Sequence, residues 1–245
     1  MSVVLNLFVA LMLPGIIVRT RALLAGRKGA PFYQHISRLG ALLCKAPVYS
    51  SATGFVFRLA PVVYLATDSE LGVVESVRKN ASTIASIFGL EDKVDQLMAD
   101  FDARIQALAE FAAGKTAIVG MCTSGSFNVL GNDGRCSILG REIGFDNIGV
   151  DADIDTSTHG NEASFEFIVD KNPDYIFVLD RDAAIGTDGA QLAQEIMENE
   201  LVMGTDAYQN GSIVYLAHPA VWYTAEGGIT ALDRMLRDLE DPLLK

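Results

Sequence analysis

The chain has 245 residues, of which 50% are hydrophobic and 20% charged, so it can bury a substantial core and is not disordered by composition. Its formal net charge of −12 argues against a nucleic-acid-binding protein, because a phosphate-binding surface needs clustered lysine and arginine. The three cysteines, Cys44, Cys122 and Cys136, lack the spacing of a disulfide framework or a zinc site. A Cys122–Cys136 bridge remains open, but two buried thiols are the favoured interpretation.

The charges are divided sharply along the chain. Residues 1–67 contain no Asp or Glu, and they carry seven Lys or Arg residues. The remaining residues hold all 31 acidic residues and the other 12 basic ones. A compact domain rarely changes sign so abruptly, so we predict a junction between two unlike segments near residues 58–68.

The first 18 residues, Met1–Val18, are almost wholly apolar, and basic residues follow them at once. This length is at the lower limit for crossing a bilayer. A secretory signal would carry its positive charge before the apolar run, and a lipidated Cys44 would need a small residue where Leu43 stands. A membrane-spanning helix is therefore favoured over a signal peptide, with a buried helix of a soluble core as the alternative. The positive-inside rule then places the basic residues in the cytoplasm and Met1 outside.

The N-terminal segment carries the motifs Pro14-Gly15, Arg19-Thr-Arg21-Ala22, Gly26-Arg27-Lys28-Gly29, Gln34 and Lys45-Ala-Pro-Val-Tyr49-Ser. Over about residues 1–63 they resemble the first helix and loop of a membrane subunit shared by formate-hydrogenlyase-type hydrogenases and respiratory complex I. That family needs several further spanning helices, which this sequence does not contain. The resemblance therefore implies an anchor and carries no proton-pumping function.

Beyond residue 68 the hydrophobic pattern alternates between helix and strand. Helical spacing predicts helices over residues 69–88, 92–113, 137–143, 164–170, 191–199 and 230–239. Apolar runs predict strands over residues 115–122, 126–130, 175–179 and 212–216. This order predicts an α/β fold, Rossmann-like, with a largely parallel sheet flanked by helices and preceded by an apolar N-terminal helix.

Catalytic signatures are missing from the sequence, so no enzyme is predicted. There is no GxSxG elbow, P-loop, HExxH, or GxGxxG after a strand. The small polar run Thr123-Ser-Gly-Ser126 has no following lysine and is interpreted as a turn. The three histidines are too far apart in sequence to form a metal cluster within one helix.

Four polar residues lie at the ends of predicted elements, where open α/β sheets bind ligands. They are Arg135, His159, Arg181 and Tyr223. Three of them have an ordinary alternative: a surface ion pair with an adjacent aspartate for Arg181, helix capping or hydrogen bonding for His159 and core packing for Tyr223. Together they suit a ferric catecholate, because the two arginines can receive a trianion and the imidazole and phenolate can ligate Fe(III).

From residue 59 onward the sequence carries Leu59-Ala-Pro-Val-Val-Tyr64-Leu, Ile87-Phe88-Gly89, Gly134-Arg135, Ser157-Thr-His159-Gly160, Ser164-Phe-Glu-Phe-Ile168, Lys171-Asn-Pro-Asp-Tyr-Ile-Phe-Val-Leu-Asp-Arg181 and Pro219-Ala-Val-Trp-Tyr223. Over residues 59–241 these motifs resemble the catecholate-siderophore-binding proteins of iron-importing ABC systems. The resemblance implies one lobe of a class III periplasmic-binding-protein fold. It divides the chain into an apolar, basic segment (1–58), a linker with a long interlobe helix (59–90) and the C-terminal siderophore-binding lobe (91–245).

The resemblance also implies a function. Arg135 and Arg181 would contact the ligand, and His159 and Tyr223 would ligate its iron. A ferric siderophore would be the ligand, with no intrinsic cofactor, and an ABC permease and ATPase would be the partners. The protein would act at the extracytoplasmic face of the cell membrane, attached through its N-terminal helix.

Three points stay open beside this interpretation. The family's N-terminal lobe has no counterpart in the sequence, so a truncated receptor is expected. The run Cys136-Ser-Ile-Leu-Gly-Arg141 replaces an aromatic residue and a His-Asp pair that are usual in the family. The positive-inside rule would put the acidic portion in the cytoplasm, which conflicts with an extracytoplasmic receptor. The first alternative function is a fragment of a hydrogenase or complex I membrane subunit fused to an incidental soluble domain, and the second is a small-molecule-binding or interaction module unrelated to iron.

Overall fold

The computed structural model describes residues 63, 65–150, 161–162 and 165–244, and these belong almost entirely to one compact unit, Leu65–Lys245. The predicted apolar helix and the segment 1–58 lie outside the described residues, as does His159. Within the part that is described, no helix combines the length and the apolar character needed to cross a bilayer.

Two long antiparallel helices open the described unit: α5 (Val73–Phe88) and α6 (Glu91–Ala112). The predicted start of the first helix at residue 69 is wrong by four residues. The chain bends at Gly72, whose φ of 83° is left-handed, and the carboxylate of Glu142 accepts hydrogen bonds from the amides of Val73 (2.8 Å) and Val74 (3.4 Å). A cap supplied from a distant loop therefore defines where α5 begins. The predicted end is confirmed, with Gly89 as a left-handed C-cap.

Within the described residues the sheet has six strands, which form both parallel and antiparallel pairs. The strands are β1 (Thr116–Thr123), β2 (Ser126–Val129), β3 (Asp146–Asn147), β4 (Asn161–Glu162), β5 (Tyr175–Asp180) and β6 (Ile213–Tyr215). Their order is β4-β2-β1-β5-β6, and β3 pairs with the start of β1. Strands β3, β5 and β6 are parallel to β1, whereas β2 and β4 form antiparallel pairs.

The sheet is therefore mixed, and the prediction of a largely parallel sheet holds for β1, β3, β5 and β6 but not for β2 and β4. The cause is the two-residue turn between β1 and β2. Ser124 (φ 52°) and Gly125 (φ 83°) are both left-handed, which is the backbone of a tight hairpin, so β2 must return antiparallel to β1.

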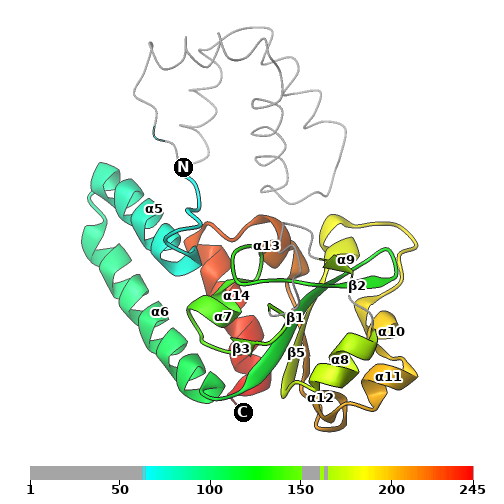
Figure 1. Ribbon diagram of the computed structural model, residues 1–245. Helices are drawn as coiled ribbons and strands as arrows, with labels where there is room; N and C mark the ends of the chain where they lie inside the picture. The colour runs from blue at the N-terminus through cyan, green and yellow to red at the C-terminus, as the bar shows by residue number, and fades with distance from the viewer. Residues whose placement is uncertain (1–62, 64, 151–160, 163–164, 245) are drawn as a thin grey trace, which may run out of the picture. The chain divides into compact units, whose positions relative to one another are not determined.

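The remaining helices cover both faces of the sheet. They are α7 (Ile138–Arg141), α8 (Phe165–Lys171), α9 (Arg181–Ile185), α10 (Ala193–Met197), α11 (Glu200–Met203), α12 (Asp206–Gln209), α13 (Pro219–Thr224) and α14 (Ile229–Leu243). Helices α5, α6 and α14 lie on one side, and α8, α10, α11 and α12 on the other (Figure 1). Successive side chains of a strand point to opposite faces of the sheet. Val119 and Phe177 pack into the core beneath α5, α6 and α14, and Ile118 and Ile176 pack into the core on the other face.

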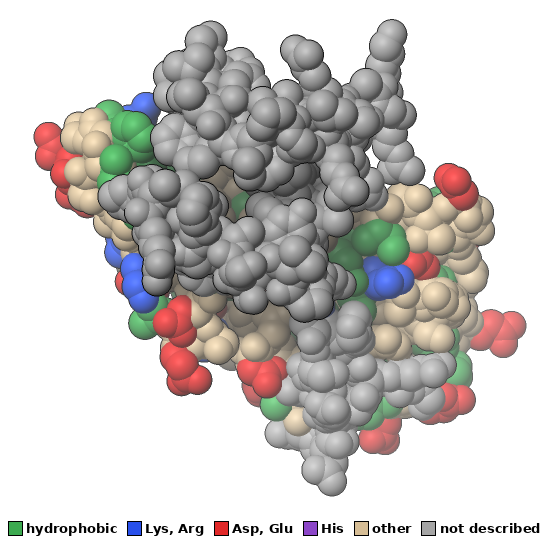
Figure 2. Space-filling model, turned by 90° about the horizontal axis from the view of Figure 1, so that it is seen from above, with side chains coloured by type: hydrophobic (Ala, Val, Ile, Leu, Met, Phe, Trp, Pro, Cys, Tyr) green, Lys and Arg blue, Asp and Glu red, His purple; other side chains and the backbone are tan. Residues whose placement is uncertain are grey.

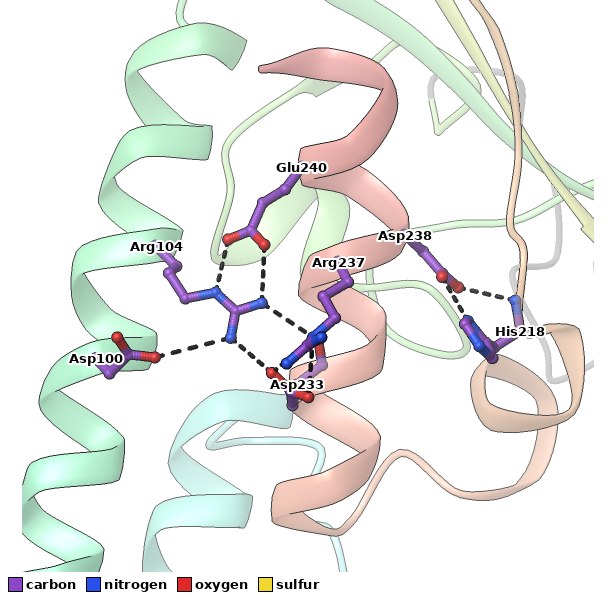
Figure 3. Close-up of polar contacts among 7 residues, drawn as sticks. All are labelled: Asp100, Arg104, His218, Asp233, Arg237, Asp238 and Glu240. Atoms are coloured by element: carbon purple, nitrogen blue, oxygen red, sulfur yellow. Dashed lines mark hydrogen bonds and ion pairs between the residues drawn. The ribbon is translucent and has the colours of Figure 1, made fainter. Parts of the chain in front are cut away.

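An ion-pair network joins α6 to α14. The guanidinium of Arg104 donates to Glu240 (2.6 Å) and to Asp233 (2.9 Å), and its side chain is only 19% exposed (Figure 3). The hydrogen bond that Arg104 donates to Glu240 raises the pKa of Arg104, against the opposing effect of burial. This network positions α14, the helix whose Asp238 reaches toward the candidate site.

Two of the three cysteines, Cys122 and Cys136, lie in the described unit as free, buried thiols, which confirms the favoured interpretation. Burial raises the pKa of Cys122 to about 12, with a further contribution from nearby aspartates. A thiol with so high a pKa is almost never a thiolate at neutral pH, so Cys122 serves packing and not chemistry.

Candidate functional site

The candidate site lies at the carboxyl end of the central parallel strands. Strand β5 passes directly into α9 at Arg181, because the Asp180 carboxylate caps that helix by accepting from the amide of Ala183 at 2.8 Å. The same carboxylate accepts from the amide of Ala193 at 3.0 Å, which ties the start of α10 to this edge. The local sequence thus fixes Arg181 at the end of the sheet where open α/β folds bind ligands.

Arg181 is held by three side chains. Its Nε donates to Tyr223 Oη at 3.1 Å, and its Nη1 donates to Thr123 Oγ1 at 3.1 Å and to Asp182 Oδ1 at 3.2 Å. The hydrogen bond with Tyr223 raises the pKa of Arg181, so the group stays cationic. Asp182 is buried and also accepts from the Ser124 amide at 2.7 Å, so it braces Arg181 internally instead of forming a surface ion pair.

Arg135 approaches the same tyrosine from the loop between β2 and α7. Its Nε donates to the backbone oxygen of Tyr223 at 3.0 Å, and its Cζ lies 4.2 Å from the centre of the Tyr223 ring. The Cζ of Arg181 lies 5.7 Å from the same ring centre. Both guanidinium groups are therefore within cation–π range of one aromatic ring. We call Arg135, Arg181 and Tyr223 the arginine–tyrosine rim.

The rim unites three of the four residues predicted from the sequence, although they are separated by as many as 88 positions along the chain. The fourth, His159, lies outside the described residues. Among the residues that are described, no group of three or more His, Cys, Asp or Glu side chains is arranged to hold a metal ion. Chemically, the rim offers two fixed cations and a phenol, a combination that suits an aromatic or multiply charged anion.

Sequence reasoning missed Glu226, which lies beside the rim. Its Oε1 accepts from the amide of Cys136 at 3.4 Å. Burial raises the pKa of Glu226 to about 7, although the charge of Arg135 acts in the opposite direction. The sequence offers no local signal for Glu226, because its contact with the Cys136 amide depends on the path of a loop about 90 positions away.

The cationic rim stands out against the charge of the rest of the molecule. On the face shown in Figure 2, acidic side chains are spread around the periphery of the described residues, and basic ones are sparser. The chain as a whole carries a formal charge of −12. An anion can bind such a protein only where cations are gathered locally, as Arg135 and Arg181 are.

The family assignment agrees with this architecture. A family model described as periplasmic binding protein matches residues 56–220, which is more than half of the chain. The chain belongs to the periplasmic binding protein family. The predicted α/β fold and the resemblance of residues 59–241 to binding proteins are thereby confirmed.

Individual members of the periplasmic binding protein family show how much of the fold is shared. The petrobactin-binding protein YclQ of Bacillus subtilis (strain 168) is 34% identical over 190 residues, 77% of this chain and 58% of that protein. Its crystal structure matches with a TM-score of 0.69 at 33% identity, covering 80% of this chain and 67% of that one. The ferric-anguibactin-binding protein FatB of Vibrio anguillarum is 27% identical over 207 residues, 81% of this chain and 62% of that protein.

A further solved structure is the periplasmic catecholate-siderophore-binding protein VctP of Vibrio cholerae. It matches with a TM-score of 0.68 at 28% identity, covering 80% of this chain and 69% of that one. The chain thus spans 58% and 62% of the lengths of YclQ and FatB.

Proposed function

We propose that this periplasmic binding protein binds a ferric siderophore of the catecholate class at its arginine–tyrosine rim. It would present the complex to the permease and ATPase of an ABC importer on the extracytoplasmic face of the membrane. The observation that carries the proposal is the gathering of two guanidinium groups around one phenol at the carboxyl end of the sheet. The printed names of its relatives, which describe petrobactin, ferric-anguibactin and catecholate-siderophore binding, support the ligand class.

The electrostatics of the rim suit this ligand. A ferric tris-catecholate is a trianion, and arginine stays protonated while offering forked donors to its oxygens. Arg181 is already held by Thr123, Asp182 and Tyr223, so little side-chain freedom remains to be lost when a ligand binds. The Tyr223 ring, only partly buried, can in addition pack against a catechol ring.

The proposal includes direct iron ligation where the siderophore leaves coordination positions open. Tyr223 Oη accepts a hydrogen bond from the Arg181 guanidinium, which orients the phenol oxygen, and a tyrosine oxygen is a good ligand for Fe(III). His159 would be the second ligand, and this remains a prediction because it lies outside the described residues.

A fluorescence titration tests the proposed function. Trp222, the single tryptophan, is fully buried and directly precedes Tyr223 in α13. We expect a ferric catecholate to quench its emission in a saturable way and the iron-free siderophore to quench it less. N-acetyl-tryptophanamide at matched absorbance corrects for light absorbed by the complex. Quenching no greater than in that control, across a wide range of chelate concentrations, would contradict the proposal.

Tyr223→Phe separates iron ligation from ordinary packing. With a chelator that leaves two iron positions open, we expect the affinity to fall about tenfold, equivalent to about 1.4 kcal/mol. With a chelator that fills all six positions, the loss should be at most about twofold to threefold, because only the hydroxyl is removed. His159→Ala should behave in the same way. Equal losses with both chelators would show that these residues do not ligate iron.

The alternative function, a fragment of a hydrogenase or complex I membrane subunit, is not favoured. The periplasmic binding protein match covers residues 56–220 and so accounts for most of the described unit, up to the start of α13. Attachment to the membrane through residues 1–18 stays a prediction, since that segment lies outside the described residues.

A further inference from the structure

A buried carboxylate on α14 holds both ends of the helix that carries Tyr223. Asp238 Oδ2 accepts from the backbone amide of His218 at 2.9 Å and from Trp222 Nε1 at 2.8 Å. Asp238 Oδ1 lies 2.6 Å from His218 Nδ1 (Figure 3). His218 is the N-cap residue of α13, and Trp222 lies in its last turn. The Asp238 side chain is only 2% exposed.

Helix α13 depends on such external contacts for its orientation. It contains only six residues, Pro219–Thr224, and a helix this short is not stable on its own. Its N-cap makes no side-chain capping bond of its own. Trp222 and Tyr223 are neighbours and point about 100° apart around the helix axis. Because Asp238 fixes the indole of Trp222 in the core, it also determines the direction in which Tyr223 points.

Stability alone gives no reason for a carboxylate at this position. Burying a charged group is costly, and well-packed apolar side chains of similar volume are often as stable as buried charges that are hydrogen-bonded. The hydrogen bonds of Asp238 instead supply direction, because each one is aimed at a defined atom of the His218–Trp222 segment. Trp222 is followed in the chain by Tyr223, which accepts hydrogen bonds from Arg135 and Arg181. A continuous path of contacts therefore joins α14 to the rim.

We propose that Asp238 is a positioning residue for the ligand site, which sets the orientation of α13 and thereby holds the Tyr223 phenol against Arg181. Its effect on ligand affinity rests on the proposed function. Its effect on the Arg181–Tyr223 contact does not, so the two can be tested separately.

Three substitutions weaken the hydrogen bonds of Asp238 to the His218–Trp222 segment to different extents. Asp238→Leu keeps the branching at Cγ and replaces both acceptor oxygens with methyl groups. Asp238→Asn keeps one acceptor oxygen for the His218 amide and the indole, and its amide can donate to a neutral imidazole, so it should act as the conservative rescue. His218→Ala removes only the contact on the solvent side, where the imidazole is 47% exposed, and carries little risk to folding.

The first measurement needs no ligand. The ¹⁵N resonance of Arg181 Nε, assigned with Arg181→Gln, reports its hydrogen bond to Tyr223. We expect Asp238→Leu to move this resonance to the position that Tyr223→Phe gives, His218→Ala to move it part of the way, and Asp238→Asn to leave it nearly unchanged. A wild-type position in folded Asp238→Leu protein would overturn the proposal. If that variant does not fold, an unmoved resonance in His218→Ala protein would do the same.

The second measurement is the affinity for a ferric catecholate in a double-mutant cycle. Asp238→Leu should weaken binding about tenfold in the wild-type background and at most about twofold when Tyr223 is alanine. Equal losses in both backgrounds would show that Asp238 does not act through Tyr223. If wild-type protein does not bind the chelate at all, the proposed function fails, and the Arg181 resonance alone decides whether Asp238 positions Tyr223.

Discussion

Replacing Arg135 and Arg181 together with glutamine is expected to lower the affinity for a trianionic ferric catecholate by about 100- to 10,000-fold. A hydrogen bond to a charged group contributes about 1.5 to 3 kcal/mol, and the rim would lose two such groups. Glutamine keeps polar character and much of the volume, so the loss reports charge and not packing. The measurement is the dissociation constant from Trp222 quenching, after circular dichroism has shown that the variant is folded.

A matched control removes the same charge elsewhere. Arg78, paired with Glu75 and Asp102, and Arg237, paired with Asp233, make exposed ion pairs on other helices. Changing both to glutamine alters the net charge equally, but salt screens distant charges, so affinity should fall less than about threefold. A control variant that loses as much affinity as the rim variant would show that general charge, and not the rim, attracts the ligand.

Glu226→Gln is expected to stabilise the protein at alkaline pH and to have little effect at acidic pH. The folded protein raises the pKa of Glu226 from its ordinary value of 4.5 to about 7. Between these values the folded state holds a proton on Glu226 more often than the unfolded state does, so the contribution of this group to stability falls as pH rises through the window. Above pH 7 the full penalty of the charged carboxylate is present, at most about 3.4 kcal/mol for a shift of this size. Glutamine carries no charge and does not incur that penalty.

Urea unfolding at intervals from pH 4.5 to 8 measures this effect. The difference in unfolding free energy between Glu226→Gln and wild type should grow steadily toward pH 8. Glu110→Gln, at an exposed position of α6, is the matched control for replacing one glutamate with glutamine. A difference for Glu226→Gln that does not grow with pH would show that the pKa of Glu226 is not raised in the folded protein.

Most of the fold could be predicted from local patterns, and the errors have identifiable causes. The ends of α5 and α6 and the apolar run of β5 follow from periodicity and terminal glycines. The start of α5 could not be predicted, because its cap comes from Glu142, about 70 positions away. The antiparallel return of β2 was predictable in principle, since Ser124-Gly125 is a two-residue turn between two apolar runs.

Some residues of the candidate site could likewise be predicted from the sequence, and others could not. Arg181 and Tyr223 were predictable because each follows a predicted strand, and strand ends gather at one edge of a sheet. The contact of Arg135 with the Tyr223 ring depends on a loop whose path no local pattern specifies. Glu226 and Asp238 were missed because their importance comes from burial, and nothing in their sequence neighbourhoods distinguishes them from exposed acids.

The central claim is that the arginine–tyrosine rim receives a ferric siderophore, and locating the iron tests it most directly. Crystals of the full chain grown with a ferric catecholate, measured at the iron absorption edge, give the metal position from anomalous scattering. We expect the iron peak at the carboxyl end of the sheet, beside Tyr223 Oη and facing both guanidinium groups. A bound chelate whose iron lies on any other surface of the protein would contradict the account.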